Sequence, residues 1–289
     1  MSDLRRRAGL LAGAGWLGLS VLPRTVWAQG TAPTRPLLLG VLPITSTRVL
    51  LKNYQHVAAY LERRLGVKIE LETAPDFQTF HRNTLEGRYD MIVTAPHLGR
   101  HAELDAGYAP LARYSALHRT LIVMSRARPV RKADELRGAS IAMIDALTLA
   151  STEAHAWLRA RGLQPGADYS VVYTPTPASA AHALVNGQAL LAVSSPQGML
   201  NTPKELRDEI EVFVALPEMP SLLWLGHGRV SKLLPQIKPA LLAFAGDTSD
   251  GQPFFEATGY QGLREVQLAE LQAVDVHLPR LRGMMGSGK

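Results

Sequence analysis

Short apolar runs alternate along the chain with segments whose apolar residues recur at helical spacing. The run Leu37–Leu42 stops at Pro43 and predicts a buried strand. Residues 50–65 then repeat apolar side chains at helical spacing, and they are followed by Gly66, a residue that favours the backbone conformation found after a helix. The first elements predicted in this way are strand 37–42, helix 50–65, strand 67–71, helix 77–85 behind an Asp76 cap, and strand 91–93.

The same alternation continues in the second half of the chain. It predicts strands at residues 121–124, 141–144, 171–173 and 189–193, an apolar segment at 222–225, and helices at residues 134–138, 154–161, 180–185, 230–244 and 265–274. Strands that alternate with helices predict βαβ units, and therefore an α/β fold with a mostly parallel sheet in each of two similar units. Two such lobes with a ligand between them are the expected architecture.

The first 28 residues have the pattern of an export signal. Arginines at positions 5–7 precede an uncharged run over residues 8–22, and the segment ends in the small residue Ala28. This pattern predicts a signal peptide over residues 1–28 that is cleaved near Ala28, which places the mature protein in the periplasm. The Arg6-Arg7 pair resembles a twin-arginine signal, so the general and the twin-arginine export routes both stay open, and an N-terminal anchor helix is the alternative to cleavage.

Composition and charge exclude several classes of protein. The sequence has 289 residues and no cysteine, which excludes disulfides, thiolate metal sites and cysteine nucleophiles. Four of its 31 Lys and Arg residues and one of its 25 Asp and Glu residues precede residue 29, so the net charge of +6 falls to +3 in the mature chain. No basic run is dense enough to indicate nucleic-acid binding, and we expect a monomer that is soluble after export.

Enzyme and metal motifs are missing from the sequence. It contains no Gly-x-Ser-x-Gly elbow, no Walker loop, no His-Glu-x-x-His and no dinucleotide fingerprint, and the pair Ser194-Ser195 has no assignable base. His97 and His101 are four residues apart, but no carboxylate stands at motif spacing, so we interpret them as surface histidines. We therefore expect no catalysis, no cofactor and no metal.

Five short motifs carry a resemblance to a known family. They are Gly40–Pro43, Tyr60–Val67, Gly87–Pro96, Ala133–Gly138 and Ala183–Gly187. In this order, behind an export signal, the chain resembles the phosphate/phosphite/phosphonate-binding family of periplasmic solute-binding proteins. The resemblance implies a two-lobed type II periplasmic-binding-protein fold, in which the second lobe is inserted into the first and hinge strands join them.

The resemblance also implies limits for the lobes and a function. Residues 37–118 and 222–289 would be lobe 1 and residues 119–221 lobe 2, with the crossings near Arg119 and Leu222. Residues 29–36, before lobe 1, are predicted to be a short linker from their own composition, because they contain two prolines, threonine and glycine. The implied function is the binding subunit of an ABC importer, which takes a small oxyanion or related solute and docks on an inner-membrane permease. The alternative is a periplasmic sensor that signals an oxyanion to a membrane histidine kinase, and a third possibility is a scaffold that binds protein rather than solute.

The expected pocket differs from the pattern of the family at four positions. A Ser-Thr-Ser-Gly run of the family corresponds to residues 147–150 here, a tyrosine to Phe77, a histidine to Pro177, and an acidic residue to Leu190. These differences put phosphonate as the ligand in doubt, while the fold stands. The candidates for ligand binding are residues that match the family's binding loops or that follow predicted strands. They are Thr45, Ser46, Phe77, Thr94, His97, Thr148, Ser151, Thr152 and Thr176.

Several candidates have a simpler structural interpretation. Thr45 and Ser46 could cap the helix that follows them, Thr148 and its neighbours could be N-caps, and Thr176 could lie in a turn. If the ligand is an anion, we expect two loops of lobe 1, at residues 45–46 and 94–97, to lie on one side of it. The helix start at residues 148–152 would lie on the other side. His97 is then the expected cationic partner, and it would strengthen binding below about pH 6.5.

Overall fold

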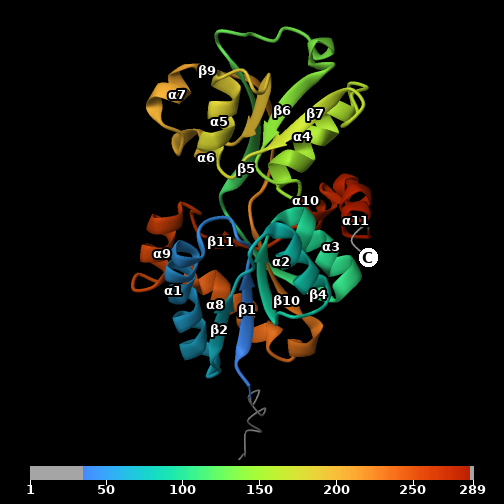
Figure 1. Ribbon diagram of the computed structural model, residues 1–289. Helices are drawn as coiled ribbons and strands as arrows, with labels where there is room; N and C mark the ends of the chain where they lie inside the picture. The colour runs from blue at the N-terminus through green and yellow to red at the C-terminus, as the bar shows by residue number, and fades with distance from the viewer. Residues whose placement is uncertain (1–34, 287–289) are drawn as a thin grey trace, which may run out of the picture. The chain divides into compact units, whose positions relative to one another are not determined.

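Two mixed β-sheets organise residues 35–286, the part of the chain that this computed structural model describes (Figure 1). The strands of the first sheet, in spatial order, are β11 (Leu263–Arg264), β4 (Tyr108–Tyr114), β10 (Leu223–His227), β3 (Met91–Thr94), β1 (Leu37–Val41) and β2 (Ile69–Glu72). Those of the second sheet are β7 (Tyr169–Tyr173), β6 (Ala139–Met143), β8 (Leu191–Ser194), β5 (Leu117–Ser125) and β9 (Ile210–Pro220). The α/β class and the two-sheet plan predicted from the sequence are confirmed.

Helices flank both sheets. Those around the first sheet are α1 (Thr47–Leu65), α2 (Phe77–Leu85), α3 (Pro96–Ala106), α8 (Leu234–Phe244), α9 (Gly251–Thr258), α10 (Leu268–Gln272) and α11 (Leu278–Gly286). The second sheet carries α4 (Leu149–Arg159), α5 (Pro177–Val185), α6 (Pro196–Leu200) and α7 (Lys204–Asp208). Short 3₁₀ helices are η1 (Ala133–Leu136), η2 (Gly228–Val230) and η3 (Asp275–His277). Helix α1 packs against α8 and α9, and α3 packs against α2, β4 and β10.

The sheets are mixed, which corrects the prediction of mostly parallel sheets. In the first sheet β1 pairs in parallel with β2 and β3, whereas β10 runs antiparallel to both β3 and β4. In the second sheet β6 is parallel to β7 and β8, while β5 is antiparallel to β8 and β9. The predicted βαβ units account for the parallel pairs. Four of the strands in antiparallel pairs, β4, β5, β9 and β10, are next to the places where the chain passes from one sheet to the other.

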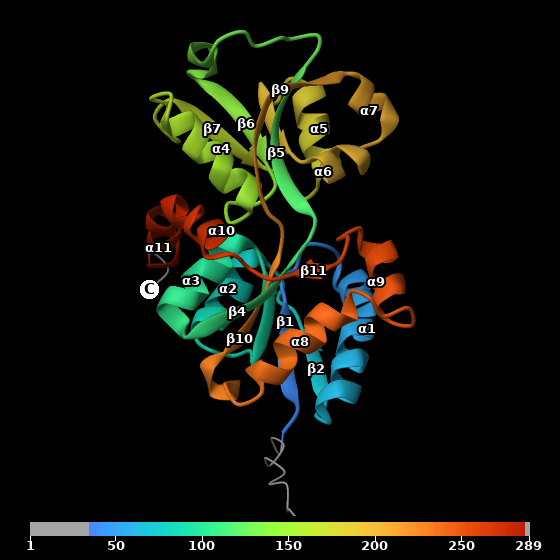
Figure 2. The ribbon, with the colours of Figure 1, turned by 180° about the vertical axis from the view of Figure 1, so that it is seen from behind.

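Two neighbouring segments connect the sheets. The chain leaves the first sheet after β4 and enters β5 two residues later, and it returns from β9 to β10 through residues 221–222. Strands β5 and β9 pair along their length, from Leu117 opposite Pro220 to Ser125 opposite Ile210 (Figure 2). Both passages therefore lie side by side.

Strands β4 and β9 and helix α9 are among the elements that were not predicted, because their residues break the expected pattern. Strand β4 contains Pro110 and the buried Arg113, and β9 contains Pro217 and Pro220, so neither shows a clean apolar alternation. Helix α9 begins at Gly251, a weak helix former. The predicted helix at residues 134–138 is instead the 3₁₀ turn η1, which ends one residue before Arg137.

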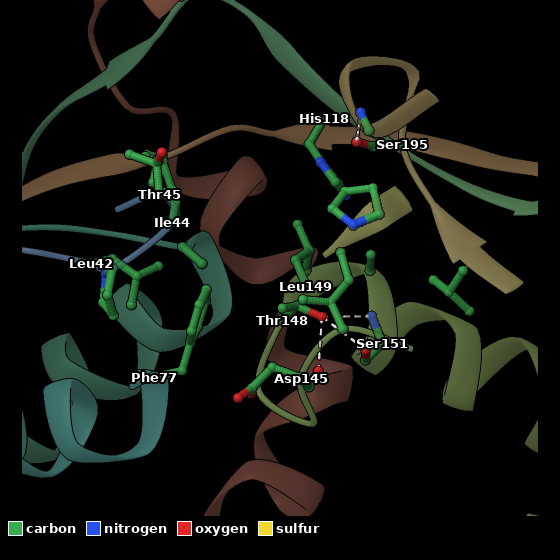
Figure 3. A pocket seen from close by; sticks show the side chains of 18 of the residues that line it. Leu42, Ile44, Thr45, Phe77, His118, Asp145, Thr148, Leu149, Ser151 and Ser195 are labelled. Carbon is green, nitrogen blue, oxygen red and sulfur yellow. Dashed lines mark hydrogen bonds between the residues drawn. The ribbon is translucent and has the colours of Figure 1, made fainter. Parts of the chain in front are cut away.

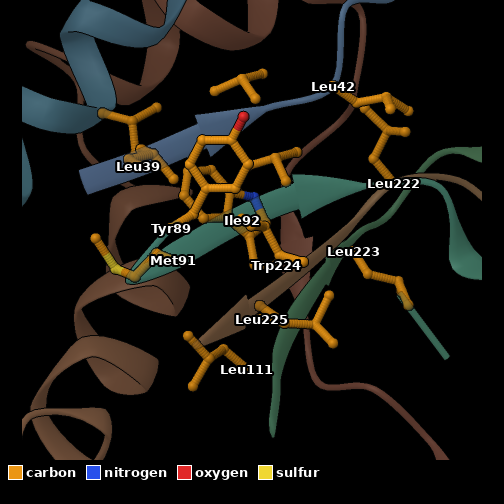
Figure 4. Close-up of a cluster of buried hydrophobic side chains, with 14 of the residues drawn as sticks. Leu39, Leu42, Tyr89, Met91, Ile92, Leu111, Leu222, Leu223, Trp224 and Leu225 are labelled. Carbon is orange, nitrogen blue, oxygen red and sulfur yellow. The ribbon is translucent and has the colours of Figure 1, made fainter. Parts of the chain in front are cut away.

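The core of the first sheet explains one glycine of the motif Gly40–Pro43. The ring of Tyr89 lies over Gly40, and a Cβ added there would come within 2.6 Å of its Cγ atom. Phe80 stacks on the same ring at 5.2 Å between centroids, and both side chains are fully buried. Figure 4 shows Tyr89 beside Ile92 and Trp224 in the centre of this cluster. Only glycine leaves room for the tyrosine at this point of β1.

The predicted signal peptide, residues 1–28, and residues 29–34 of the predicted linker lie outside the described residues. Within residues 35–286, no helix combines the length and the apolar character that crossing a membrane requires.

Candidate functional site

A cleft of about 740 Å³ lies between the two sheets, and loops from both of them line it (Figure 3). The first sheet contributes the loops after β1, β2 and β3, and the second sheet those after β6, β7 and β8. Each of these loops follows the carboxyl end of a strand in a parallel pair, which is where open α/β sheets bind ligands. The two linking segments close one side with His118, Pro220, Ser221 and Leu222.

Six helices begin at the cleft. Their N-cap residues all line it, and they are Ser46 for α1, Asp76 for α2, Ala95 for α3, Thr148 for α4, Thr176 for α5 and Ser195 for α6. The first backbone N–H groups of a helix lack intrahelical acceptors, and the helix dipole is positive at this end. The helix starts therefore contribute positive partial charge to the cleft without any charged side chain.

The caps confirm part of the simpler interpretation of the candidates. The Oγ1 atom of Thr148 accepts a hydrogen bond from the Ser151 N–H at 3.1 Å, and Thr176 and Asp76 cap their helices in the same manner. Ser46 occupies the N-cap position of α1 but makes no capping bond through its side chain. Its hydroxyl and that of Thr45 are exposed at the cleft.

Six of the nine candidates line the cleft, and three do not. The six are Thr45, Ser46, Phe77, Thr148, Ser151 and Thr176. Thr152 is buried and donates its hydroxyl hydrogen to the Thr148 carbonyl at 2.9 Å, and Thr94 is buried in β3. His97 lies behind the cleft wall, where Ala95 and Pro96 stand in front of it. That these six residues contact a ligand stays a prediction.

His97 is not a cation, which corrects the expected role. It is completely buried, and its Nε2–H donates to the Leu147 carbonyl at 3.0 Å, a bond that joins α3 to the loop before α4. Burial lowers the pKa of His97 to about 3, although the bond to Leu147 acts in the opposite direction. His97 is thus neutral at physiological pH and cannot attract an anion.

The prediction that His97 and His101 are surface histidines is wrong as well. His101 is 3% exposed, accepts at Nδ1 from His81 at 2.8 Å, and pairs through Nε2 with Asp105 at 3.0 Å. Helix α3 is buried because it packs between α2 and strands β4 and β10. Its polar sequence, Pro-His-Leu-Gly-Arg-His, gave no sign of this burial.

The charges in the cleft are acidic. No lysine or arginine is among its lining residues within the described chain, whereas Asp76 and Asp145 are. Burial raises the pKa of Asp145; the Leu147 N–H lowers it and the nearby Asp76 raises it further. Burial also lowers the pKa of His118, which is therefore neutral. A ligand with several negative charges would meet these two carboxylates without a compensating cation.

Two cleft residues, Asp145 and His118, were not among the candidates predicted from the sequence. Asp145 directly follows a predicted strand, so the rule that selected Thr45 and Thr94 would have found it. His118 stands on a linking strand, and nothing in its neighbourhood marks it. Among residues 35–286, no group of three or more His, Asp or Glu side chains is arranged to hold a metal ion.

The side of the cleft formed by the first sheet carries three apolar side chains beside Thr45, Ser46 and Asp76. Leu42, Ile44 and Phe77 of the first sheet face the polar side, where Thr148, Ser151 and Asp145 lie (Figure 3). Proline occupies the first turn of α3, α5 and α6, where it removes an N–H donor. Helix α4 begins with Leu149 and Ala150 and keeps all of its N–H groups. The start of α4 is therefore the richest source of donors on the polar side.

A family model described as "ABC transporter, phosphonate, periplasmic substrate-binding protein" matches residues 39–271. Solved structures with a similar fold include XAC2383 from Xanthomonas citri, determined with chloride and with ATP, at 16% identity and a TM-score of 0.76. The match covers 86% of this chain and 99% of that one. No curated protein matches the sequence.

Two further structures share the fold. PhnD1 from Prochlorococcus marinus, in complex with methylphosphonate, is 12% identical with a TM-score of 0.73 and matches over 86% of this chain and 98% of its own. The aliphatic sulphonate binding protein SsuA from Escherichia coli is 15% identical with a TM-score of 0.58, over 88% and 94%. At these identities the structures show a common fold and leave the ligand open.

Proposed function

Because the chain belongs to the family of periplasmic substrate-binding proteins of ABC phosphonate transporters, we propose that its cleft binds a small, singly charged oxyanion for import. The observation that carries this proposal is the convergence of six helix N-termini on a cleft whose lining has no lysine or arginine. Helix N-termini favour anions through their free N–H groups and their dipoles. The family consists of solute-binding proteins rather than enzymes.

A single charge is proposed because of Asp76 and Asp145. Both carboxylates line the cleft, so every additional negative charge on the ligand adds repulsion that no side chain offsets. The anionic group would lie at the start of α4, near Thr148 and Ser151. An apolar substituent would then face Leu42, Ile44 and Phe77 across the cleft.

Methylphosphonate itself should bind weakly. Two of the four positions that correspond to the polar run of the family are occupied by Leu147, which is buried in the core of the first sheet, and by Leu149, which is apolar. Phe77 and Pro177 line the cleft without a side-chain donor, and Leu190 does not line it. Each missing hydrogen bond to a charged group weakens binding by roughly 1.5 to 3 kcal/mol.

A thermal-shift screen tests the proposed ligand class. Methanesulfonate and acetate carry one charge, whereas sulfate carries two, and phosphate and methylphosphonate complete the panel. A ligand at 100 times its Kd stabilises the protein by about 2.7 kcal/mol, so binding is readily seen. We expect larger shifts for the singly charged anions. No shift with any of them, or a larger shift with sulfate, would contradict the proposal.

Delivery to an inner-membrane ABC permease is proposed rather than signalling to a histidine kinase, because the matching family model describes transporter proteins. Uptake of labelled methanesulfonate by cells with and without the gene separates the two roles. Transport predicts that uptake is lost with the gene. Unchanged uptake, together with a lost transcriptional response, would favour a sensor.

A further inference from the structure

Three side chains, connected by hydrogen bonds, lead from the cleft to helix α4 beside the second sheet. His118 lines the cleft at the start of β5, and its Nε2 lies 3.1 Å from the Oγ1 atom of Thr120. The Thr120 hydroxyl forms a second hydrogen bond, to Oε2 of Glu153 on α4. Thr120 is completely buried and Glu153 is 7% exposed, so these two side chains have little access to water.

The surroundings of Glu153 supply no counter-charge. Helix α4 packs against β5, β8 and η3, and the titratable side chains on these elements are His118, Arg119, Asp275 and His277. Arg119 pairs with Glu218 at 2.9 Å and Asp275 with Arg100 at 2.8 Å, and burial lowers the pKa of both histidines, so that they are neutral. Burial raises the pKa of Glu153 to about 7, against the lowering effect of the Thr120 hydroxyl.

The direction of the hydrogen bonds depends on this carboxyl group. When Glu153 is ionised it can only accept, so Thr120 donates to it and His118 donates from Nε2 to Thr120. The Nδ1 atom of His118 is then an unprotonated acceptor, and it has no hydrogen-bond partner among residues 35–286. When Glu153 is protonated the bonds can reverse, and His118 then carries its hydrogen on Nδ1.

We propose that His118 contacts the bound oxyanion, and that the chain His118–Thr120–Glu153 takes up one proton on binding and so changes Nδ1 from an acceptor into a donor. The proton enters at Nδ1 from water in the cleft. The Nε2 hydrogen passes to Thr120, and the former hydroxyl hydrogen of Thr120 passes to Glu153. One proton is gained, His118 stays neutral, and Nδ1–H donates to the anion.

This inference rests on the proposed function, and it makes His118 a residue that determines specificity. An acceptor at Nδ1 would repel an oxyanion, whereas a donor binds it. Affinity should therefore fall as the pH rises above about 7, by about tenfold or more between pH 7 and 9. Singly charged anions that do not titrate in this range are the ligands that reveal the effect.

The first test needs no ligand. Long-range ¹H–¹⁵N NMR spectra distinguish the two tautomers of His118, whose signals are assigned by comparison with His118→Asn. We expect a change from the Nε2–H tautomer to the Nδ1–H tautomer as the pH falls from 9 to 5.5, with a midpoint near 7. Glu153→Gln should abolish the change, because its amide does not titrate. One unchanged tautomer across this range in the wild type would overturn the proposal.

The second test is calorimetry with methanesulfonate, in buffers that differ in ionisation enthalpy. We expect the uptake to approach one proton at pH 8 in the wild type and in Glu218→Gln, which removes a charge from the neighbouring strand β9. Glu153→Gln should bind without uptake and with a pH-independent Kd, and Thr120→Val should lose the uptake. If the wild type bound methanesulfonate without taking up a proton, the proposed proton transfer through His118, Thr120 and Glu153 would be refuted. If it did not bind methanesulfonate at all, the proposed function would be refuted.

Discussion

Asp90 is a fully buried carboxylate that holds three segments of the first sheet together. Its Oδ1 atom accepts from Arg35 at 2.7 Å and from Arg229 at 2.6 Å, while Oδ2 accepts from the backbone N–H of Leu38 at 2.8 Å. Burial by itself would raise the pKa of Asp90, but these bonds lower it to about 2. The carboxylate is therefore ionised at neutral pH, and its bonds to Arg35 and to the Leu38 N–H hold the beginning of β1 in place.

Replacing Asp90 by Asn should destabilise the protein by about 2 to 3 kcal/mol, because two arginines lose their charged acceptor. Urea unfolding at pH 7 measures the change. Asp208→Asn is the matched control, since its pair with Lys204 lies on the surface and should contribute little. Equal unfolding midpoints for the two variants would show that Asp90 has no such role.

Glu153→Gln should change stability in a pH-dependent manner. The pKa of Glu153 is raised from 4.5 to about 7 in the folded protein, so the folded state binds more protons than the unfolded state between these values. Wild-type stability is therefore lost as the pH rises from 4.5 to 7. The variant avoids this loss and should be more stable than the wild type at pH 8, by up to about 3 kcal/mol. Thermal unfolding of wild type and variant at pH 4 and at pH 8 measures this difference in stability. The same difference at both pH values would contradict the prediction.

The start of α4 brings capping and binding together in one element. The Thr148 hydroxyl accepts a hydrogen bond from the Ser151 N–H. As a donor its Oγ1 atom lies 3.0 Å from the Asp145 carbonyl oxygen and 2.8 Å from the Ser151 hydroxyl oxygen. The loop before the helix is fixed by the bond between His97 and the Leu147 carbonyl. The donors of the first turn are thus held in place before any ligand arrives.

Thr148→Val should weaken methanesulfonate binding about tenfold and lower stability by about 1 kcal/mol, because one hydroxyl serves both purposes. Calorimetry and urea unfolding measure the two effects. Ser231→Ala, on an exposed turn far from the cleft, is the control. An unchanged Kd for Thr148→Val would place the anion elsewhere in the cleft.

At the scale of elements, local signals explain what the sequence could predict. Helices with a marked start or end, such as α1 before Gly66 and α2 behind Asp76, were found because the signal lies next to the element. Strands β4 and β9 were missed because partner strands, rather than their own alternation, stabilise them. The burial of His97 and the position of His118 depend on neighbours that are distant in sequence, and no local pattern encodes them.

Within residues 35–286, the cleft lies between two sheets that two adjacent passages of the chain join. The passages at residues 115–116 and 221–222 flank the paired strands β5 and β9 (Figure 2). A few residues in such segments can absorb a rotation while both cores stay intact. The lobe limits predicted from the sequence, 37–118 with 222–289 and 119–221, stay a prediction at this scale.

Ligand binding should draw the two lobes together about these passages. Small-angle scattering of the mature protein should give a smaller radius of gyration with saturating methanesulfonate than without it. Thr148→Val, measured at a concentration that leaves it mostly unbound, should keep the larger value. An identical radius in bound and free wild type would contradict a hinge at residues 115–116 and 221–222.

A crystal structure of the protein with methanesulfonate would show directly whether the start of α4 binds the anion. We expect the sulfonate oxygens to lie within hydrogen-bond distance of the first N–H groups of α4 and of His118 Nδ1. We also expect the methyl group to lie against Phe77 and Leu42, with no lysine or arginine in contact. A sulfonate bound outside the cleft, or held by a basic side chain, would contradict this expectation.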